Sequence, residues 1–127
     1  MQRCPCCNSR LPAGGSLCSR CGADLSQALR CEALAEQWLA LSVQTLNADQ
    51  ADIAVAAVNR SLSFKQTSAA RLFRDFLLQH QYQTLYDCLA KKQWQDARLT
   101  IARLQILQGD NETLFRFLAL IEHLNMN

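Results

Sequence analysis

The sequence predicts a mainly α-helical protein that begins with a short cysteine-rich segment. Two Cys-x-x-Cys pairs lie within the first 21 residues, and from Asp24 onward the composition changes from Cys, Gly and Pro to Ala, Leu, Gln and Arg. Beyond that point the apolar residues recur at the spacing of amphipathic helices, and no run alternates long enough to form a sheet. We therefore expect a small unit over residues 1–23 and a helical domain over residues 24–127.

The N-terminal unit is too short to bury an apolar core of its own. Its cysteines have the spacing Cys4-x2-Cys7-x10-Cys18-x2-Cys21. Two Cys-x-x-Cys turns at the tips of a hairpin can surround one ion with four thiolates in a tetrahedron, which is the geometry of structural zinc sites. The spacing predicts a structural Zn²⁺ with these four ligands. The alternatives are rubredoxin-like iron, an iron–sulfur cluster and a redox dithiol.

The residues between the ligands fit such a hairpin. Residues 12–15, Pro-Ala-Gly-Gly, are expected to form its far turn, and Leu11 and Leu17 to cover the metal from either side. Asn8 and Gly22 each follow the second cysteine of a pair. Both residue types tolerate the positive φ that turns backbone amides toward sulfur.

This segment resembles the small bacterial zinc ribbons that are often placed at protein N-termini. The resemblance covers residues 3–22. It implies a ribbon fold with the four paired cysteines as ligands, and it assigns no activity, because such ribbons serve nucleic-acid binding, protein docking and structural roles. The motifs that carry it are Cys4-Pro5-x-Cys7 and Cys18-x-x-Cys21-Gly22.

Three cysteines lie outside the two pairs. Cys6 departs from the ribbon pattern, since adjacent Cys6 and Cys7 would bind one ion awkwardly. Cys31 and Cys88 have apolar neighbours in helical segments and are expected to be buried thiols, with a spare metal ligand as the alternative for Cys31. An odd number of cysteines without a signal peptide favours the reducing cytoplasm, where paired cysteines bind metal more often than they form disulfides.

Turn signals divide the remainder into about six antiparallel helices. We expect Asp24 or Ser26 to cap the first helix, Asp49 to cap the second, and only a tight turn near residues 79–81 to separate the third from the fourth. The turns at 91–93 and 109–111 complete the division. The first expected helix covers about 26–46, and the other five carry apolar stripes over residues 53–62, 70–77, 82–89, 97–107 and 114–124.

Residues 82–111 resemble one tetratricopeptide helix pair. Lys92 replaces the usual turn glycine, and no proline ends the unit. Stacked pairs of this kind leave a concave surface for peptides; a plain helical bundle is the alternative. The matching features are Leu85, Trp94, Ala97, Ile101, Leu104 and the terminator Gly109-Asp110-Asn111.

The sequence contains no pattern typical of catalysis. His80 and His123 are the only histidines, and neither has a nucleophile and an acid at motif spacing. We expect His80 to be a solvated residue at a helix end and His123 to lie at a helix C-terminus. Four protein ligands would leave the zinc no position for water. The sequence therefore predicts a protein that is not an enzyme, with no catalytic residue.

We expect an adaptor or regulatory protein that binds protein partners through its ribbon and its helices. Residues 1–30 contain four arginines and one acidic residue, Asp24. This excess of positive charge supports the alternative of a nucleic-acid-binding or transcription-related factor. One zinc with four thiolates lowers the formal charge of +2 to near zero, so bulk charge gives that alternative little support. A redox or metal-handling role is a third alternative. No apolar run could span a membrane. Phe115 lies off the apolar stripe of its helix and is expected to be exposed to a partner.

Overall fold

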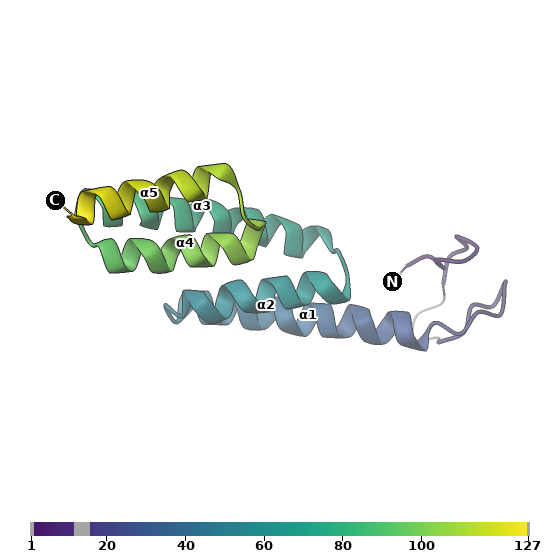
Figure 1. Cartoon of the computed structure of the whole chain (residues 1–127). Helices are drawn as coiled ribbons and strands as arrows, with labels where there is room; N and C mark the ends of the chain where they lie inside the picture. Colours follow the sequence, from purple (N-terminus) through teal and green to yellow (C-terminus); the bar gives the residue numbers. More distant parts are fainter. Residues whose placement is uncertain (1, 12–15, 127) are drawn as a thin grey trace.

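The computed structural model describes residues 2–11 and 16–126 and confirms a mainly α-helical protein (Figure 1). Consecutive helices pack against each other in antiparallel pairs. No helix in these ranges combines the length and the apolarity needed to cross a bilayer. The five helices described are α1 (Ser26–Asn47), α2 (Ala51–Phe64), α3 (Ser68–Ala90), α4 (Trp94–Gln108) and α5 (Glu112–Met126).

The expected break near residues 79–81 was wrong, and five helices replace the expected six. α3 runs without interruption from Ser68 to Ala90. Gln81 faces the core at 1% exposure, between buried Leu77 and Leu85, which lie four residues before and after it. Of the polar residues 79–81, one therefore lies on the buried face of a continuous helix and two lie on its solvent face. His80, expected at a helix end, lies exposed in the middle of α3.

The residues at the helix ends differ in part from the capping residues that the sequence predicts. Thr67 caps α3 by accepting a hydrogen bond from the backbone N–H of Ala70. Neither Asp24 nor Ser26 caps α1, because Leu25 stands at that position; the Asp24 carboxylate accepts a hydrogen bond from the backbone N–H of Ser26. Asp49 does not cap α2. Its φ is 62°, and it ends α1 in a Schellman motif, in which left-handed backbone follows the last turn of the helix. Lys92, with φ 58°, ends α3 in the same way.

The α1–α2 hairpin is held by two reciprocal hydrogen bonds between buried groups. The Ser42 hydroxyl of α1 donates to the carbonyl of Ala54 in α2 at 2.6 Å, and the Ser61 hydroxyl of α2 donates to the carbonyl of Ala35 in α1 at 2.6 Å. Small residues at these positions let the two backbones approach closely. The hydroxyls therefore fix the register of the two helices as well as their distance.

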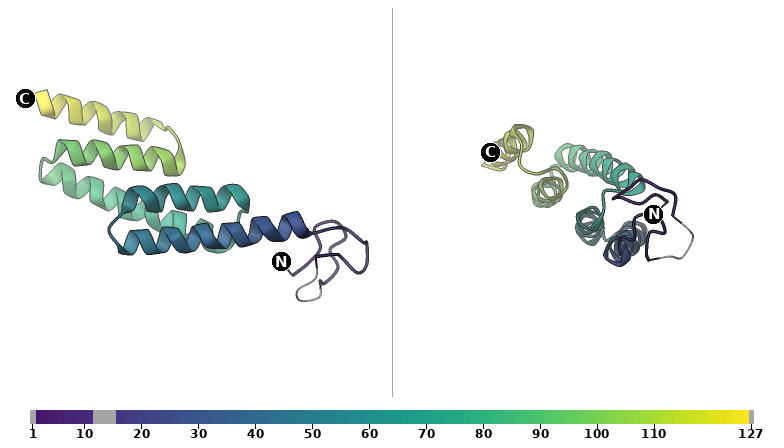
Figure 2. Two further views of the ribbon diagram at one scale, coloured as in Figure 1. Left: turned by 90° about the horizontal axis from the view of Figure 1, so that it is seen from below. Right: turned by 90° about the vertical axis from the view of Figure 1, so that its right-hand side faces the viewer.

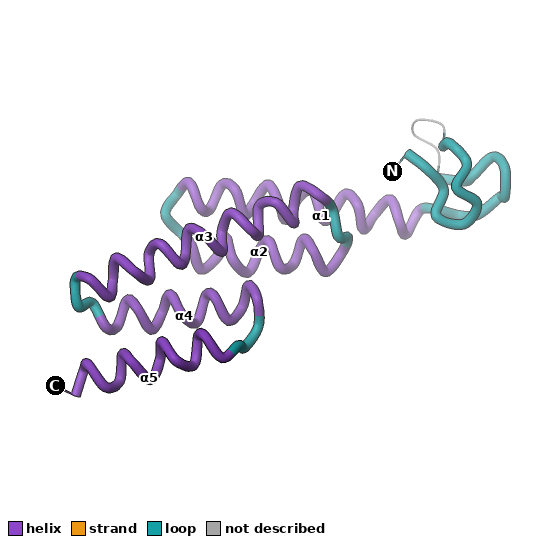
Figure 3. Tube along the Cα trace, turned by 90° about the horizontal axis from the view of Figure 1, so that it is seen from above, coloured by secondary structure: helices purple, strands orange, loops and turns teal. Residues whose placement is uncertain are grey.

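α3 connects two apolar cores (Figures 1 and 3). Its first half contributes Leu77 to a core with Val55 and Val58 of α2 and Leu107 of α4. Its second half packs with α4 and α5 around a larger core, which contains Leu85, Cys88, Ala97, Ile101, Leu104, Leu114 and Ile121. The helices thus form a staggered row rather than a single closed bundle, as the turned views show (Figure 2).

Four residues on the apolar stripes of the expected helices are exposed instead of buried: Ile53, Phe76, Tyr86 and Leu124. Ile53 is 47% exposed, because α2 buries the face that carries Ala54 and Val58. Phe76 is 53% exposed, because the buried face of α3 centres on Gln81. Phe115 is exposed, as its position off the stripe predicted.

Candidate metal centre

The structure gathers the four cysteines of the two pairs into one cluster. Their Sγ atoms all lie within 4.8 Å of one another. Sulfurs of different pairs lie close together, with 3.6 Å between the Sγ atoms of Cys4 and Cys21 and 3.6 Å between those of Cys7 and Cys18. Four sulfurs at about 2.3 Å from a central zinc ion lie roughly 3.8 Å apart. The cluster therefore has the composition and size for a metal ion such as zinc.

The cluster is built from two copies of one local structure, fourteen positions apart. In each copy the backbone N–H of the first cysteine donates to the carbonyl of the residue five positions ahead. The carbonyl of the same cysteine accepts a hydrogen bond from the N–H of the residue four positions ahead. An antiparallel bridge closes each copy, Arg3 with Arg10 and Leu17 with Asp24. The equivalent hydrogen bonds are Cys4–Ser9 with Cys18–Ala23, Asn8–Cys4 with Gly22–Cys18, and Leu11–Gln2 with Leu25–Ser16.

The residue after each pair has the backbone conformation that the sequence predicts. Asn8 has φ 61° and Gly22 has φ 73°. This left-handed turn directs backbone N–H groups toward the first sulfur of each pair, as in the 3.4 Å contact from the Cys6 N–H to the Cys4 sulfur. Both turns therefore present hydrogen-bond donors to a thiolate.

Ser9 joins the two copies at the cluster. Its hydroxyl lies 3.0 Å from the sulfur of Cys7 and 3.3 Å from the sulfur of Cys18. The backbone N–H of Cys21, the Ser9 hydroxyl and the backbone N–H of Arg20 lower the pKa of Cys18 to about 5. These donors favour the thiolate, which is the form that binds metal.

The four sulfurs lie too close together for all of them to ionise at once without a cation. At Cys21 the backbone N–H of Ala23 acts to lower the pKa, but the sulfurs of Cys18, Cys4 and Cys7 outweigh it and raise the pKa to about 12. A dication at the centre would favour the thiolate at every position. The chemistry of the cluster thus fits a bound metal.

The apolar cover of the cluster differs from the expectation in one residue. Leu11 packs against the cluster, as predicted, but Leu17 is 59% exposed. Buried Leu25 takes its place. Leu25 lies fourteen residues after Leu11, so the repeat in the hydrogen bonds could have identified it. The turn expected at residues 12–15 lies outside the described residues.

The remaining cysteines stay outside the cluster. Cys6 is exposed and contributes only its backbone N–H. Cys88 is buried in the core of α3, α4 and α5, where burial raises its pKa, as expected for a buried thiol. Cys31 is half-buried on α1, so the expected burial is only partial. His123 lies in the last turn of α5, as predicted.

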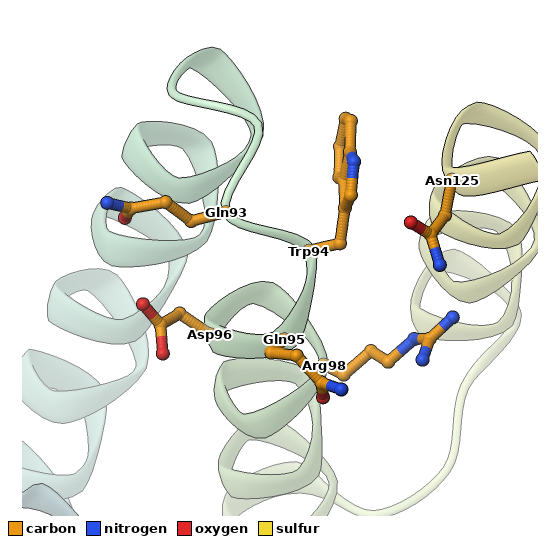
Figure 4. A pocket seen from close by; sticks show the side chains of 6 residues that line it. All are labelled: Gln93, Trp94, Gln95, Asp96, Arg98 and Asn125. Atoms are coloured by element: carbon orange, nitrogen blue, oxygen red, sulfur yellow. The ribbon is translucent and has the colours of Figure 1, made fainter. Parts of the chain in front are cut away.

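Two of the cavities that open on the described surface are large enough for a small ligand. One, of about 410 Å³, lies between the N-terminal segment and the α1–α2 hairpin. The other, of about 380 Å³, lies where α4 begins beside the end of α5, with Trp94 and Asn125 on facing elements (Figure 4). Its other lining residues are Gln93, Gln95, Asp96 and Arg98. This lining offers amides, one carboxylate and one guanidinium, without an imidazole, hydroxyl or thiol.

Comparison with known protein families, with curated proteins and with solved structures gives no match for this chain. Its function is therefore inferred from its own residues and their geometry.

Proposed function

We propose that the chain is a non-enzymatic cytoplasmic adaptor or regulatory protein that binds protein partners. In this proposal residues 1–23 are a zinc ribbon whose zinc is structural, and residues 24–127 are the docking body. The observation that carries the proposal is an exposed apolar face on α3. A large exposed apolar patch on a soluble protein commonly marks an interaction surface.

The α3 face is defined by Leu72 and Phe76, both more than half exposed. Leu72 is 70% exposed and precedes Phe76 by one helical turn. The ring of Phe76 stacks on half-buried Phe73, with 6.0 Å between centroids, and lies 6.3 Å from the ring of His80. Aromatic residues held this way offer a partner a large contact area at a small loss of conformational entropy.

The structural role of the zinc rests on its ligands. Four thiolates complete the tetrahedron, so no position is open for a substrate or a reactive water. A ribbon without a core gains its folding free energy from the metal, roughly 10–16 kcal/mol in small zinc peptides. The ribbon would then present its exposed arginines as a second docking surface.

We further propose that α3 and α4 form a tetratricopeptide-like pair. Ala97 is fully buried at their contact, as the small residue of such a pair would be. Lys92 stands at the usual turn glycine but takes the φ of 58° that the glycine would supply. This departure in sequence is therefore compatible with the backbone of such a pair.

The test is binding of a partner identified by cross-linking in extract of the source cell. The purified partner is titrated against the wild-type protein and against Leu72→Asp/Phe76→Asp, which should bind at least tenfold more weakly. Leu99→Asp is the matched control, since Leu99 is 54% exposed on α4. The helical circular dichroism of both variants should match the wild type, because the replaced side chains are exposed. A partner that binds all three proteins equally would contradict the α3 face as the docking surface.

The alternative is a nucleic-acid-binding factor that uses the ribbon. Arg3 and Arg10 are paired across the first bridge, and like charges at opposed positions repel, so a bound phosphate would relieve that repulsion. The helical body supports this alternative less, because several of its cations already have partners. Lys65 pairs with Glu32, Arg103 with Asp52 and Arg116 with Glu112, and Arg60 lies over the rings of Trp38 and Phe64.

A mobility-shift assay at increasing salt separates the two functions. Binding to DNA or RNA that weakens steeply with salt would favour the alternative, since phosphate contacts release counterions. An absence of binding at low salt would contradict it.

A further inference from the structure

The cavity between the N-terminal segment and the α1–α2 hairpin has walls from three parts of the chain. Figures 1 and 2 show the N-terminal segment beside the start of α1 and the end of α2. The volume of about 410 Å³ falls within the range of small-ligand sites. Arg3 and Pro5 come from the first cysteine turn, Ala28 and Cys31 from α1, and Phe64 and Lys65 from the end of α2.

The cavity combines two cations with apolar walls. Arg3 and Lys65 belong to different elements and both line it, together with the rings of Pro5 and Phe64 and the methyl group of Ala28. This combination suits a ligand that carries a negative group next to a small apolar group. A guanidinium binds a carboxylate through two parallel hydrogen bonds.

Neighbouring contacts hold these groups in place. The Nη1 atom of Arg3 donates to the carbonyl of Asn8 at 3.0 Å, which fixes the guanidinium against its own turn. The guanidinium of Arg60 lies 5.6 Å from the ring centroid of Phe64 and positions that ring. Two walls of the cavity are therefore ordered by contacts that a ligand need not supply.

The charge near the cavity favours a single anionic group over a polyanion. The Nζ atom of Lys65 lies 3.3 Å from the carboxylate of Glu32. Glu32 therefore offsets part of the positive charge at this cavity. A nucleic acid brings several phosphates and would be repelled by Glu32, whereas one carboxylate is balanced.

We propose that this cavity binds the C-terminal carboxylate of a partner polypeptide whose last residue is a small apolar one. The inference rests on the proposed docking function and names one of its contacts. Arg3 binds the carboxylate, Lys65 adds a second positive charge, and Pro5, Ala28 and Phe64 contact the apolar side chain. Since Arg3 and Pro5 flank the ligand Cys4, the metal holds one wall of the site.

The test uses two small probes that differ only in charge. N-acetyl-alanine, which has a free carboxylate, and N-acetyl-alaninamide, which has none, are titrated into the ¹⁵N-labelled, zinc-loaded full chain, and amide chemical shifts are followed. The acid should shift the amides of Cys31, Phe64 and Lys65, and the amide should bind at least tenfold more weakly. Arg3→Gln and Lys65→Gln should each weaken binding of the acid about fivefold or more.

Arg10→Gln is the matched control, because Arg10 opposes Arg3 in the bridge and does not line the cavity. It should leave binding of the acid unchanged. Equal binding of acid and amide, shifts that fall elsewhere on the chain, or no shift at millimolar acid would each overturn the proposal. An oligothymidylate that displaces the acid and binds more tightly than the acid would assign the cavity to nucleic acid instead. Partner binding that depends on the α3 face and survives Arg3→Gln would show that only this inference has failed.

Discussion

Replacing Gly22 by alanine should weaken zinc binding by a defined amount. Gly22 has φ 73°, and a Cβ added to it would meet no atom within 4 Å. The cost therefore comes from the backbone alone, about 1–2 kcal/mol for an L-residue in the left-handed conformation. In the proposed zinc ribbon the cysteine turn forms on the metal, so this cost reduces zinc affinity, by roughly 5–30-fold. Competition with a chromophoric zinc chelator under reducing conditions measures the change.

Gly109 provides the control. It also has a positive φ, 80°, and open space around an added Cβ, but it ends α4 far along the chain from the cysteines. Gly109→Ala should lower the melting temperature of the helices and leave zinc affinity unchanged. Equal zinc affinity of Gly22→Ala and wild type would refute the role of the left-handed turn. A loss greater than a thousandfold would refute a purely local backbone cost.

Three further outcomes follow from the helical body. Ser42→Ala and Ser61→Ala should each lower the free energy of unfolding by about 1 kcal/mol in urea titrations, since each loses one buried interhelical hydrogen bond; no change in either would contradict that role. Ile101→Ala should cost about 2–5 kcal/mol, because Ile101 is fully enclosed by α3, α4 and α5, and a cost below 1 kcal/mol would indicate a looser core. The hydrogen bond from Arg103 lowers the pKa of Asp52, so this pair stabilises the fold above the unfolded pKa near 4 and loses that effect as pH falls through the lower folded pKa. The Asp52→Asn variant should therefore differ from wild type at neutral pH, by at most about 1 kcal/mol for so exposed a carboxylate, and converge with it in strong acid.

The helices were predictable from apolar spacing because most of the breaks between them contain residues that favour turns. The turns at Lys92 and Gly109 were visible in this way. The continuity of α3 was not, because a polar residue such as Gln81 can face a core only if the packing around it is known. Asp49 shows a similar limit, since one acidic residue can begin a helix or end the preceding one.

The cysteine cluster was predictable because cysteine spacing directly constrains which sulfurs can meet. The wrong assignment of Leu17 arose from judging each leucine by its distance from a cysteine. The fourteen-residue repeat pairs Leu11 with Leu25 and would have corrected it. The exposed α3 face depends on which helices pack together, and the junction cavity depends on where the N-terminal segment lies against α1 and α2, so neither could be found by local pattern alone.

X-ray absorption at the zinc edge of the purified full chain tests the central claim most directly. The cluster predicts one zinc per chain with four sulfur neighbours at about 2.3 Å and no oxygen or nitrogen neighbour. The Cys6→Ser variant should give the same spectrum, because Cys6 lies outside the cluster. A light-atom ligand, a different number of sulfurs, a changed spectrum for Cys6→Ser, or iron in place of zinc would contradict a closed site formed by Cys4, Cys7, Cys18 and Cys21.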